Sequence, residues 1–208
     1  MSFWENTRKP TGFGGELMVS IMNIGHRALA RWGLRYLPLE EDSRVLDCGC
    51  GGGATIKSLL KRCPKGIVKG IDYSPVSVEK ARTVNEPEVS SGRCAVLQGS
   101  VSDMIFATGW FDAVTAFETV YFWQSLLPSF HQVYRILKPG GIFCICNEEC
   151  DPVKGERWTR TIPGMTIYRA EELKAALEQT GFQNIRIHTK RRGWLCILAQ
   201  KADEPNAQ

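Results

Sequence analysis

The sequence has no long uninterrupted apolar run and little excess charge of either sign. No stretch approaches the ~18 consecutive apolar residues of a membrane-spanning helix, and the start, MSFWENTRKPTG, lacks the apolar core of a secretory signal. We therefore expect no membrane partner and a cytoplasmic location. Lys and Arg number 26 and Asp and Glu 22, a net charge of +4 without a long basic block, so we expect no nucleic-acid partner.

Disorder and a multidomain organisation are also disfavoured. Of the 208 residues, 43% are apolar and 23% charged, which is ordinary for a globular chain. This length favours one domain, 1–208. Within it we expect an N-terminal helical cap over 1–40, a core over 41–200 and a tail over 201–208.

Cysteine pairs with the C-x2-C spacing of metal sites are missing, although the chain has eight cysteines. The two C-x-C pairs are Cys48/Cys50 and Cys144/Cys146, and on a strand each pair points to one face. We expect these thiols to be buried as small apolar groups, with no metal site and no arrangement of three thiols.

Short apolar runs alternate with amphipathic stretches along most of the chain, which is typical of an α/β protein. The last two runs are separated by about four residues, too few for a crossover, so they should form an antiparallel hairpin. The pattern predicts a doubly wound, mostly parallel sheet. Strands are expected at 44–48, 67–71, 94–98, 111–117, 142–147, 182–188 and 193–200, and helices at 17–37, 54–63, 75–85, 124–137 and 170–180, with an irregular stretch of about twenty residues after the fifth strand.

A glycine-rich loop follows the first predicted strand. Gly49-x-Gly51-x-x-Ala54, with Asp72 about twenty residues later, matches the dinucleotide fingerprint, and an NAD-dependent oxidoreductase is one interpretation. Asp47 argues against it, because a carboxylate beside the helix N-terminus would repel a pyrophosphate. It suits S-adenosylmethionine, which has an ammonium group and no phosphate. A non-catalytic cofactor-binding protein is a further alternative.

Six segments in register resemble the class I S-adenosylmethionine-dependent methyltransferases, of the small type 11/25-like kind. They are VLDCGCGGG, VKGIDYSP, VLQGSVSD, FDAVTAFETVYFW, ILKPGGIF and the terminal GF with GWLCILAQK, spanning residues 44–200. The resemblance implies a Rossmann-like, seven-stranded sheet with an antiparallel last strand and an added N-terminal helix. It also implies S-adenosylmethionine as the cofactor.

The same resemblance assigns cofactor-binding positions. Asp72 corresponds to the acid that binds the ribose hydroxyls, Tyr73 to the residue packed on adenine, and Phe117 to a position beside the methyl group. Ser100 and Val101 correspond to the adenine edge, where many relatives have Asp in place of Ser100, so Asp103 or a backbone group is an alternative. The methionine end corresponds to Asp47, Gly49, Cys50, Gly51 and Gly53.

The predicted acceptor site follows the fourth strand. Glu118 is a candidate base, Tyr121 a candidate partner for a cation, and His26 a candidate from the N-terminal helix. Asn147, Glu148 and Glu149 end the fifth strand and are expected to face the acceptor. Methyl transfer by in-line displacement needs mainly the positioning of donor and acceptor.

Acceptor class is inferred from what the chain lacks. It contains no Asn-Pro-Pro-Tyr segment, the signature of amino-group nucleobase methylation. A small-molecule acceptor is therefore expected, bound by a monomer or homodimer.

Overall fold

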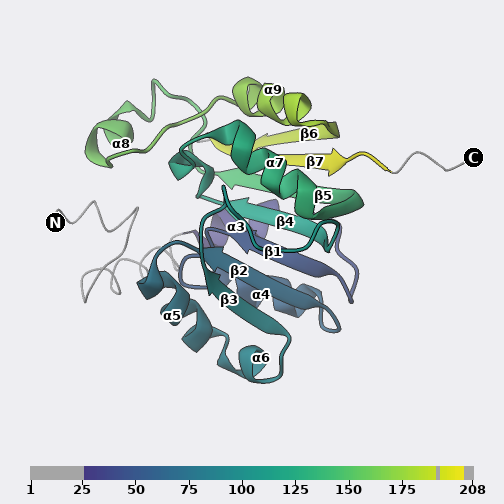
Figure 1. Ribbon diagram of the computed structural model, residues 1–208. Coiled ribbons are helices and arrows are strands. Elements are labelled where there is room, and N and C mark those ends of the chain that lie inside the picture. The colour runs from purple at the N-terminus through teal and green to yellow at the C-terminus, as the bar shows by residue number, and fades with distance from the viewer. Residues whose placement is uncertain (1–25, 191–192, 204–208) are drawn as a thin grey trace, which may run out of the picture.

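The computed structural model describes residues 26–190 and 193–203. Helices and strands alternate through most of this part of the chain (Figure 1). In chain order the elements are α3 (Arg27–Gly33), β1 (Arg44–Cys48), α4 (Ala54–Arg62), β2 (Ile67–Asp72), α5 (Pro75–Val84), α6 (Glu86–Ser90), β3 (Cys94–Gln98), β4 (Phe111–Phe117), the 3-10 turn η1 (Val120–Phe122), α7 (Leu126–Ile136), β5 (Leu137–Asn147), α8 (Glu156–Thr161), α9 (Ala170–Thr180), β6 (Phe182–Lys190) and β7 (Trp194–Lys201).

A seven-stranded sheet in the order β3-β2-β1-β4-β5-β7-β6 organises the molecule. The pairs β1–β2, β1–β4, β2–β3 and β4–β5 are parallel, whereas β7 runs antiparallel to both β5 and β6. The predicted Rossmann-like sheet and its terminal hairpin are confirmed. The strand order reverses between β1 and β4, and in open sheets of this kind ligands bind outside the carboxyl ends of the strands at such a point.

Helices cover both faces of this sheet. In Figure 1, α7 lies in front of the sheet, and α3 and α4 lie behind it. Apolar side chains of α3 and α4, such as Leu29 and Ile56, belong to one buried cluster, and those of α7 and α9, such as Phe130 and Leu173, belong to the other. The sheet is therefore buried on both sides, which accounts for its nearly continuous apolar strands.

Local sequence signals fixed two helix ends correctly. Ser74 is the N-cap of α5, its hydroxyl accepts a hydrogen bond from the Ser77 amide, and Pro75 is the first helical residue. Gly181 ends α9 in the left-handed conformation, with φ of 102°. The helix start expected at 75 and the helix end expected at 180 are thus confirmed, and each depends on a signal within one helical turn.

Other predicted boundaries were wrong. The N-terminal helix was expected over 17–37, but α3 ends at Gly33, and the part of the prediction before residue 26 lies outside the described residues. Pro139-Gly140-Gly141 was expected to separate a helix from a strand. Instead β5 begins at Leu137 and includes these residues, with an irregular register against β4.

Two short helices were not predicted. Helix α6 follows α5 directly, and α8 lies within the stretch that we expected to be irregular. Neither has a buried residue. Because they bury no apolar face, they leave no clear helical period in the sequence.

The cysteines are buried apart from Cys150, which is half-buried. Cys144 and Cys146 lie in the same apolar cluster, as expected for alternate strand positions, but Cys48 and Cys50 lie in clusters on opposite faces. The expectation of a shared face was wrong for that pair because β1 ends at Cys48, so strand alternation does not reach Cys50.

The expectation that no three thiols meet was also wrong. Cys144 Sγ lies 3.9 Å from both Cys146 Sγ and Cys196 Sγ. Strands β5 and β7 pair Cys146 with Cys196, which are 50 positions apart in the chain. A spacing argument within one segment therefore missed the cluster.

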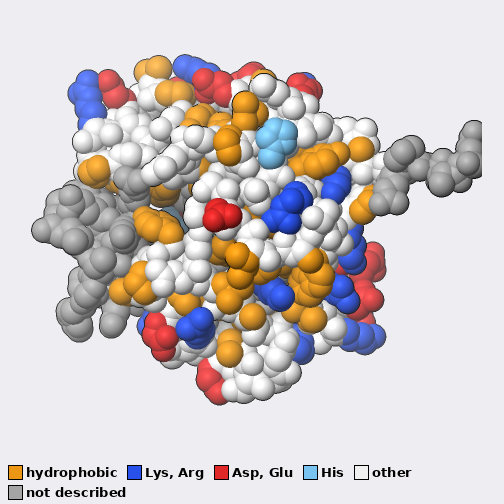
Figure 2. Space-filling view, in the orientation of Figure 1, with side chains coloured by type: hydrophobic (Ala, Val, Ile, Leu, Met, Phe, Trp, Pro, Cys, Tyr) orange, Lys and Arg blue, Asp and Glu red, His pale blue; other side chains and the backbone are white. Residues whose placement is uncertain are grey.

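Charges of both signs are interspersed with apolar side chains on the face shown in Figure 2. Among the described residues, no helix combines the length and apolar character needed to cross a bilayer.

Candidate active site

A cleft of about 1050 Å³ lies at the carboxyl ends of β1, β2 and β4. Most of the residues predicted from sequence line it. The predicted residues that do not line it are Gly53, Asp103, Tyr121, Asn147, Glu148 and Glu149. The predicted residues that line the cleft are His26, Asp47, Gly49, Cys50, Gly51, Asp72, Tyr73, Ser100, Val101, Phe117 and Glu118.

The glycine loop between β1 and α4 takes backbone conformations that favour glycine. Gly49, Gly51 and Gly53 have φ of 68°, 50° and 79°. A Cβ on Gly49 would lie 2.0 Å from the Thr119 hydroxyl oxygen, whereas a Cβ on Gly51 would meet no atom within 4 Å. Gly49 and Gly53 are thus required by packing inside the protein, and Gly51 faces open space in the cleft.

Asp72 holds this loop against the end of β2. One carboxylate oxygen accepts a 2.9 Å hydrogen bond from the Gly51 amide, and the other accepts one of 2.9 Å from the Ser74 amide. Burial raises the pKa of Asp72, and the two amide hydrogen bonds act in the opposite direction. Each oxygen retains acceptor capacity for a ligand.

Asp47 is buried in the floor of the cleft. Its carboxylate accepts a 2.6 Å hydrogen bond from the Thr115 hydroxyl on β4. Burial raises the pKa of Asp47 to about 7, the Thr115 hydrogen bond opposes the shift, and the charge of Asp72 adds to it. No described residue forms an ion pair with Asp47 or Asp72. The two carboxylates therefore suit a ligand with a cationic group and hydroxyl donors.

The expected adenine edge lies beside the end of β3. Tyr73 is 38% exposed, and the hydroxyl oxygens of Ser100 and Ser102 are 2.8 Å apart. Ser102 lines the cleft together with Ser100, whereas Asp103 does not. The geometry thus favours hydroxyl or backbone groups over Asp103 at this edge.

Glu118 directly follows β4 and lines another part of the cleft. It has φ of 60°, in the left-handed region that side chains other than glycine rarely adopt. Its carboxylate accepts hydrogen bonds from the Glu148 amide and from the Tyr121 hydroxyl, the latter at 3.3 Å. Burial, with a contribution from Glu148, raises the pKa of Glu118 to about 8. Strained backbone and a strongly shifted pKa are common at functional positions.

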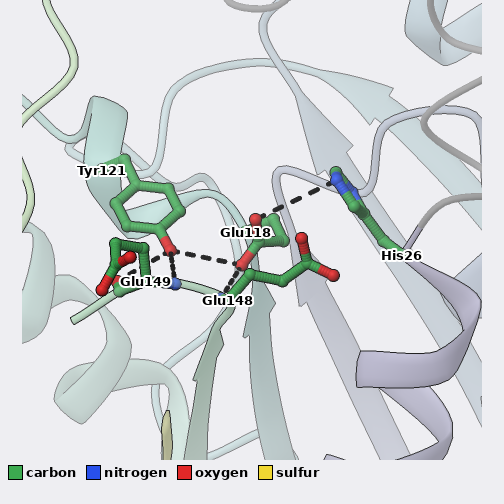
Figure 3. A network of polar contacts seen from close by, with 5 residues as sticks. All are labelled: His26, Glu118, Tyr121, Glu148 and Glu149. Carbon is green, nitrogen blue, oxygen red and sulfur yellow. Dashed lines mark hydrogen bonds and ion pairs between the residues drawn. The ribbon is translucent and has the colours of Figure 1, made fainter. Parts of the chain in front are cut away.

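Two further candidates contact Glu118 (Figure 3). His26 Nε2 lies 4.0 Å from the second carboxylate oxygen, and burial lowers the pKa of His26. The Tyr121 hydroxyl accepts a 2.9 Å hydrogen bond from the Glu149 amide. Burial raises the pKa of Tyr121 well above its usual value. At neutral pH these shifts favour an uncharged histidine, an uncharged tyrosine and a carboxyl group able to hold a proton.

Asn147 ends β5, and this residue and the two that follow it occupy three different environments. Glu148, Glu118 and His26 each offer a donor atom within 4.8 Å of the others. The Glu149 carboxylate instead accepts hydrogen bonds from the Cys150 and Asp151 amides. Asn147 is fully buried, its side-chain nitrogen and oxygen have no hydrogen-bond partner among the described residues, and it does not line the cleft.

Sequence analysis missed three residues that support the site. Thr115 sets the environment of Asp47, and Thr119 packs against Gly49. Asn85 donates hydrogen bonds to the Gly53 carbonyl at 3.1 Å and to the Ala81 carbonyl at 2.9 Å. Only Asn85 could have been found from the sequence, because it is a polar residue at the end of a predicted amphipathic helix. Thr115 lies in an apolar strand and Thr119 lies just after it, so neither stands out from its neighbours.

The fold and site define the class as a Rossmann-like domain with an open cleft at the carboxyl ends of its strands. Residues 46–145 match the family model described as a methyltransferase domain. These residues therefore form a methyltransferase domain, the fold is that of the class I S-adenosylmethionine-dependent methyltransferases, and the alternative of an NAD-dependent oxidoreductase is set aside.

Relatives and solved structures agree with this class. The chain is 31% identical to sterol 24-C-methyltransferase erg6 of Aspergillus fumigatus, over 50% of this chain and 28% of that protein. It is 28% identical to an uncharacterized methyltransferase of Synechocystis, over 82% and 81%. A SAM-dependent methyltransferase from Aquifex aeolicus superimposes with a TM-score of 0.75 at 18% identity, over 90% and 98% of the two chains.

The shared length differs among the curated relatives. The chain spans between 28% and 44% of the length of four of them, which act in sterol and hydroquinone methylation by name. The similarity to those proteins therefore covers the methyltransferase domain and not their remaining residues.

Proposed function

We propose that this protein transfers the methyl group of S-adenosylmethionine to a small-molecule acceptor. The observation that carries the proposal is the arrangement of Asp47, Gly51 and Asp72 in one cleft with Glu118. Two buried carboxylates and an open glycine lie on one side, and a carboxyl group with a raised pKa lies on the other.

The cofactor fits the residues present at its proposed site. Asp72 has the acceptor capacity to bind two ribose hydroxyls while it orders Gly51. Asp47 is buried without an ion-pair partner among the described residues, and the ammonium group of the methionine moiety would stabilise its charged form. Gly51 leaves room for the amino-acid part. Tyr73, Ser100 and Val101 would contact the adenine, and Phe117 the methyl end.

The bound cofactor supplies a methyl group on a positively charged sulfur, a good leaving group. The protein positions the acceptor in line with it, and effective molarity alone contributes roughly 7–11 kcal/mol. Glu118 acts as the base for an acceptor that loses a proton, because a pKa of about 8 matches proton transfer near neutral pH. His26 and Tyr121 orient the Glu118 carboxyl group, which they contact on different oxygens.

A small acceptor agrees with the size of the cleft and with the named sterol methyltransferase relative. The cleft of about 1050 Å³ has room for both reactants and is close to the upper end of the volumes common for small-molecule sites. A cofactor-binding protein without catalysis is the alternative that the experiment must separate.

Calorimetric titration of the full chain with S-adenosylmethionine and with NAD tests the cofactor. We expect binding of the first alone; binding of NAD alone would contradict the proposal. Release of S-adenosylhomocysteine across a panel of hydroxyl, amine and carbon acceptors then tests turnover. Glu118→Gln should lower the rate at least a hundredfold and leave cofactor affinity within threefold.

Glu156→Gln is the matched control, since this exposed carboxylate lies on α8 away from the cleft. It should retain wild-type turnover. Tight cofactor binding with no release of product across the whole panel would favour the non-catalytic alternative.

A further inference from the structure

The outer half of the cleft runs between α3 and α4 and is lined by positive side chains. These belong to residues on or just after the two helices: Arg27, Arg31, Arg35, Lys57, Lys61 and Arg62. None of these residues belongs to the proposed cofactor site. Their charge is opposite in sign to that of the side chains at the inner end, which are Asp47, Asp72 and Glu118.

Both helices begin at the reacting end and lead away from it. His26 precedes α3 and lies 4.0 Å from Glu118, while α4 follows the glycine loop at Gly53. Residues four apart lie on one helix face, so Arg27 and Arg31 share a face of α3, and the lysines of α4 share another. The positive side chains therefore form two rows along a path that starts at the proposed methyl group.

Carboxylates of the described residues do not neutralise these charges. Neither α3 nor α4 contains an acidic residue. Arg62 donates hydrogen bonds to the carbonyls of Leu34 and, at 3.4 Å, of Leu37, which ties α4 to the chain after α3. Among the described residues, none of the other five cations has an ion pair with a carboxylate.

Exposure of the five cations keeps them available to a ligand. Each of them is exposed while also lining the cleft. Positive charges gathered along a cleft attract anions, and guanidinium groups bind phosphate oxygens in pairs. The carboxylate of the cofactor's amino-acid part supplies only one negative charge, whereas this outer half of the cleft has five exposed positive side chains.

We propose that this outer half, the cationic groove, binds a phosphate or diphosphate group of the methyl acceptor. The inference rests on the proposed function and adds the acceptor's chemical class. In this arrangement the donor cofactor occupies the acidic inner end, and the acceptor extends from Glu118 along α3 and α4 with its anionic group among Arg31, Lys57 and Lys61.

Titration of the full chain with inorganic pyrophosphate, with and without saturating S-adenosylhomocysteine, tests the groove. Arg31→Gln/Lys61→Gln should weaken pyrophosphate binding at least tenfold and leave the affinity for S-adenosylhomocysteine within twofold. Arg186→Gln/Lys174→Gln removes the same charge from exposed positions on β6 and α9 and should leave both affinities within twofold.

Three outcomes would overturn the inference: no pyrophosphate binding, equal weakening in both double variants, or weakened S-adenosylhomocysteine binding in Arg31→Gln/Lys61→Gln alone. Vesicles of phosphatidylglycerol form a second arm, and vesicle binding through these residues without pyrophosphate binding would assign the groove to a lipid surface instead. Pyrophosphate binding without S-adenosylhomocysteine binding would reject the proposed function and keep the anion site. The reverse would reject only the anion site.

Discussion

The carboxylate of Asp47 accepts a 2.6 Å hydrogen bond from the hydroxyl of Thr115, its register partner across the parallel strands β1 and β4. This contact lies at the point where strand order reverses, in the floor of the cleft. A buried carboxylate is thereby held beside the glycine loop by a single uncharged donor. The free-energy cost of burying its charge raises its pKa and so sets the pH at which it ionises.

Cofactor affinity should depend on pH through Asp47. Its pKa of about 7 means that the carboxylate forms as pH rises through neutrality, so affinity for the cationic S-adenosylmethionine should rise between pH 6 and 8 and then level off. Thr115→Val removes a hydrogen bond that favours the charged form and should move this rise upward by about one pH unit. Thr115→Ser keeps the hydroxyl and should keep the wild-type profile. Calorimetric titration across pH measures both, and identical profiles for Val and Ser would contradict the assignment.

The stability of the protein should fall as pH rises because of Glu118. Its folded pKa of about 8 lies above the ordinary value of 4.5, so the folded state retains a proton that the unfolded chain has lost. The unfolding free energy should therefore decrease between about pH 4.5 and 8, by up to about 5 kcal/mol. Glu118→Gln should flatten this decline, as measured by urea unfolding at several pH values. Asp103→Asn, at an exposed carboxylate, should not change it.

Substitution of Asp72 should weaken cofactor binding through two effects. The Asp72 carboxylate accepts hydrogen bonds from the Gly51 and Ser74 amides. In Asp72→Asn the side-chain NH2 would face one of these amides, and that hydrogen bond would be lost. Asp72→Ala removes both hydrogen bonds and the ribose acceptor. Each variant should lower S-adenosylmethionine affinity more than tenfold by calorimetry. The control Asp112→Asn alters a carboxylate near the amino end of β4 and should leave the affinity unchanged. Unchanged affinity in Asp72→Ala would mean that the ribose binds elsewhere.

Two glycines of the same loop should respond differently to alanine. Gly49→Ala places a Cβ 2.0 Å from the Thr119 hydroxyl oxygen at a positive φ and should destabilise the fold by more than about 2 kcal/mol. Gly51→Ala meets no atom within 4 Å, so backbone strain of about 1 kcal/mol is the main cost. It should nevertheless lower cofactor affinity at least tenfold by filling the space proposed for the amino-acid part. Thermal unfolding and calorimetry separate the effects, and equal affinity loss without any difference in stability would contradict them.

Thiol reactivity should separate Cys150 from the other seven cysteines. Cys150 is half-buried and the rest are buried. Burial also raises the pKa of Cys48, Cys50 and Cys146 well above the usual value, so little reactive thiolate forms. A chromogenic disulfide reagent should label one thiol quickly in the native protein and all eight in denaturant. Cys150→Ala should abolish the fast phase; a fast phase that persists would show another accessible thiol.

Prediction succeeded where a signal and its consequence lie close in the chain. The end of the first strand at Cys48, the start of a helix at Pro75 and the end of a helix at Thr180 depend on residues within a few positions. It failed where packing decided the outcome. Helix α3 ends at Gly33, whose missing Cβ would lie 2.2 Å from the Cys146 sulfur, although no helix-breaking residue follows until Pro38.

The fold class follows from the sequence alone, and so does the choice of residues proposed for the cofactor end of the site. Short apolar runs that alternate with amphipathic stretches indicate a sheet covered by helices on both faces. The glycines from Gly49 to Gly53 allow a tight loop after the first strand, and Asp72 lies at the end of the second strand about twenty residues later. Tertiary structure alone decided the rest: the contact between His26 and Glu118, the meeting of three thiols, and the cationic groove between α3 and α4. These features depend on which strands and helices become neighbours and on how completely each group loses water. Both properties belong to the packed molecule and not to any single segment.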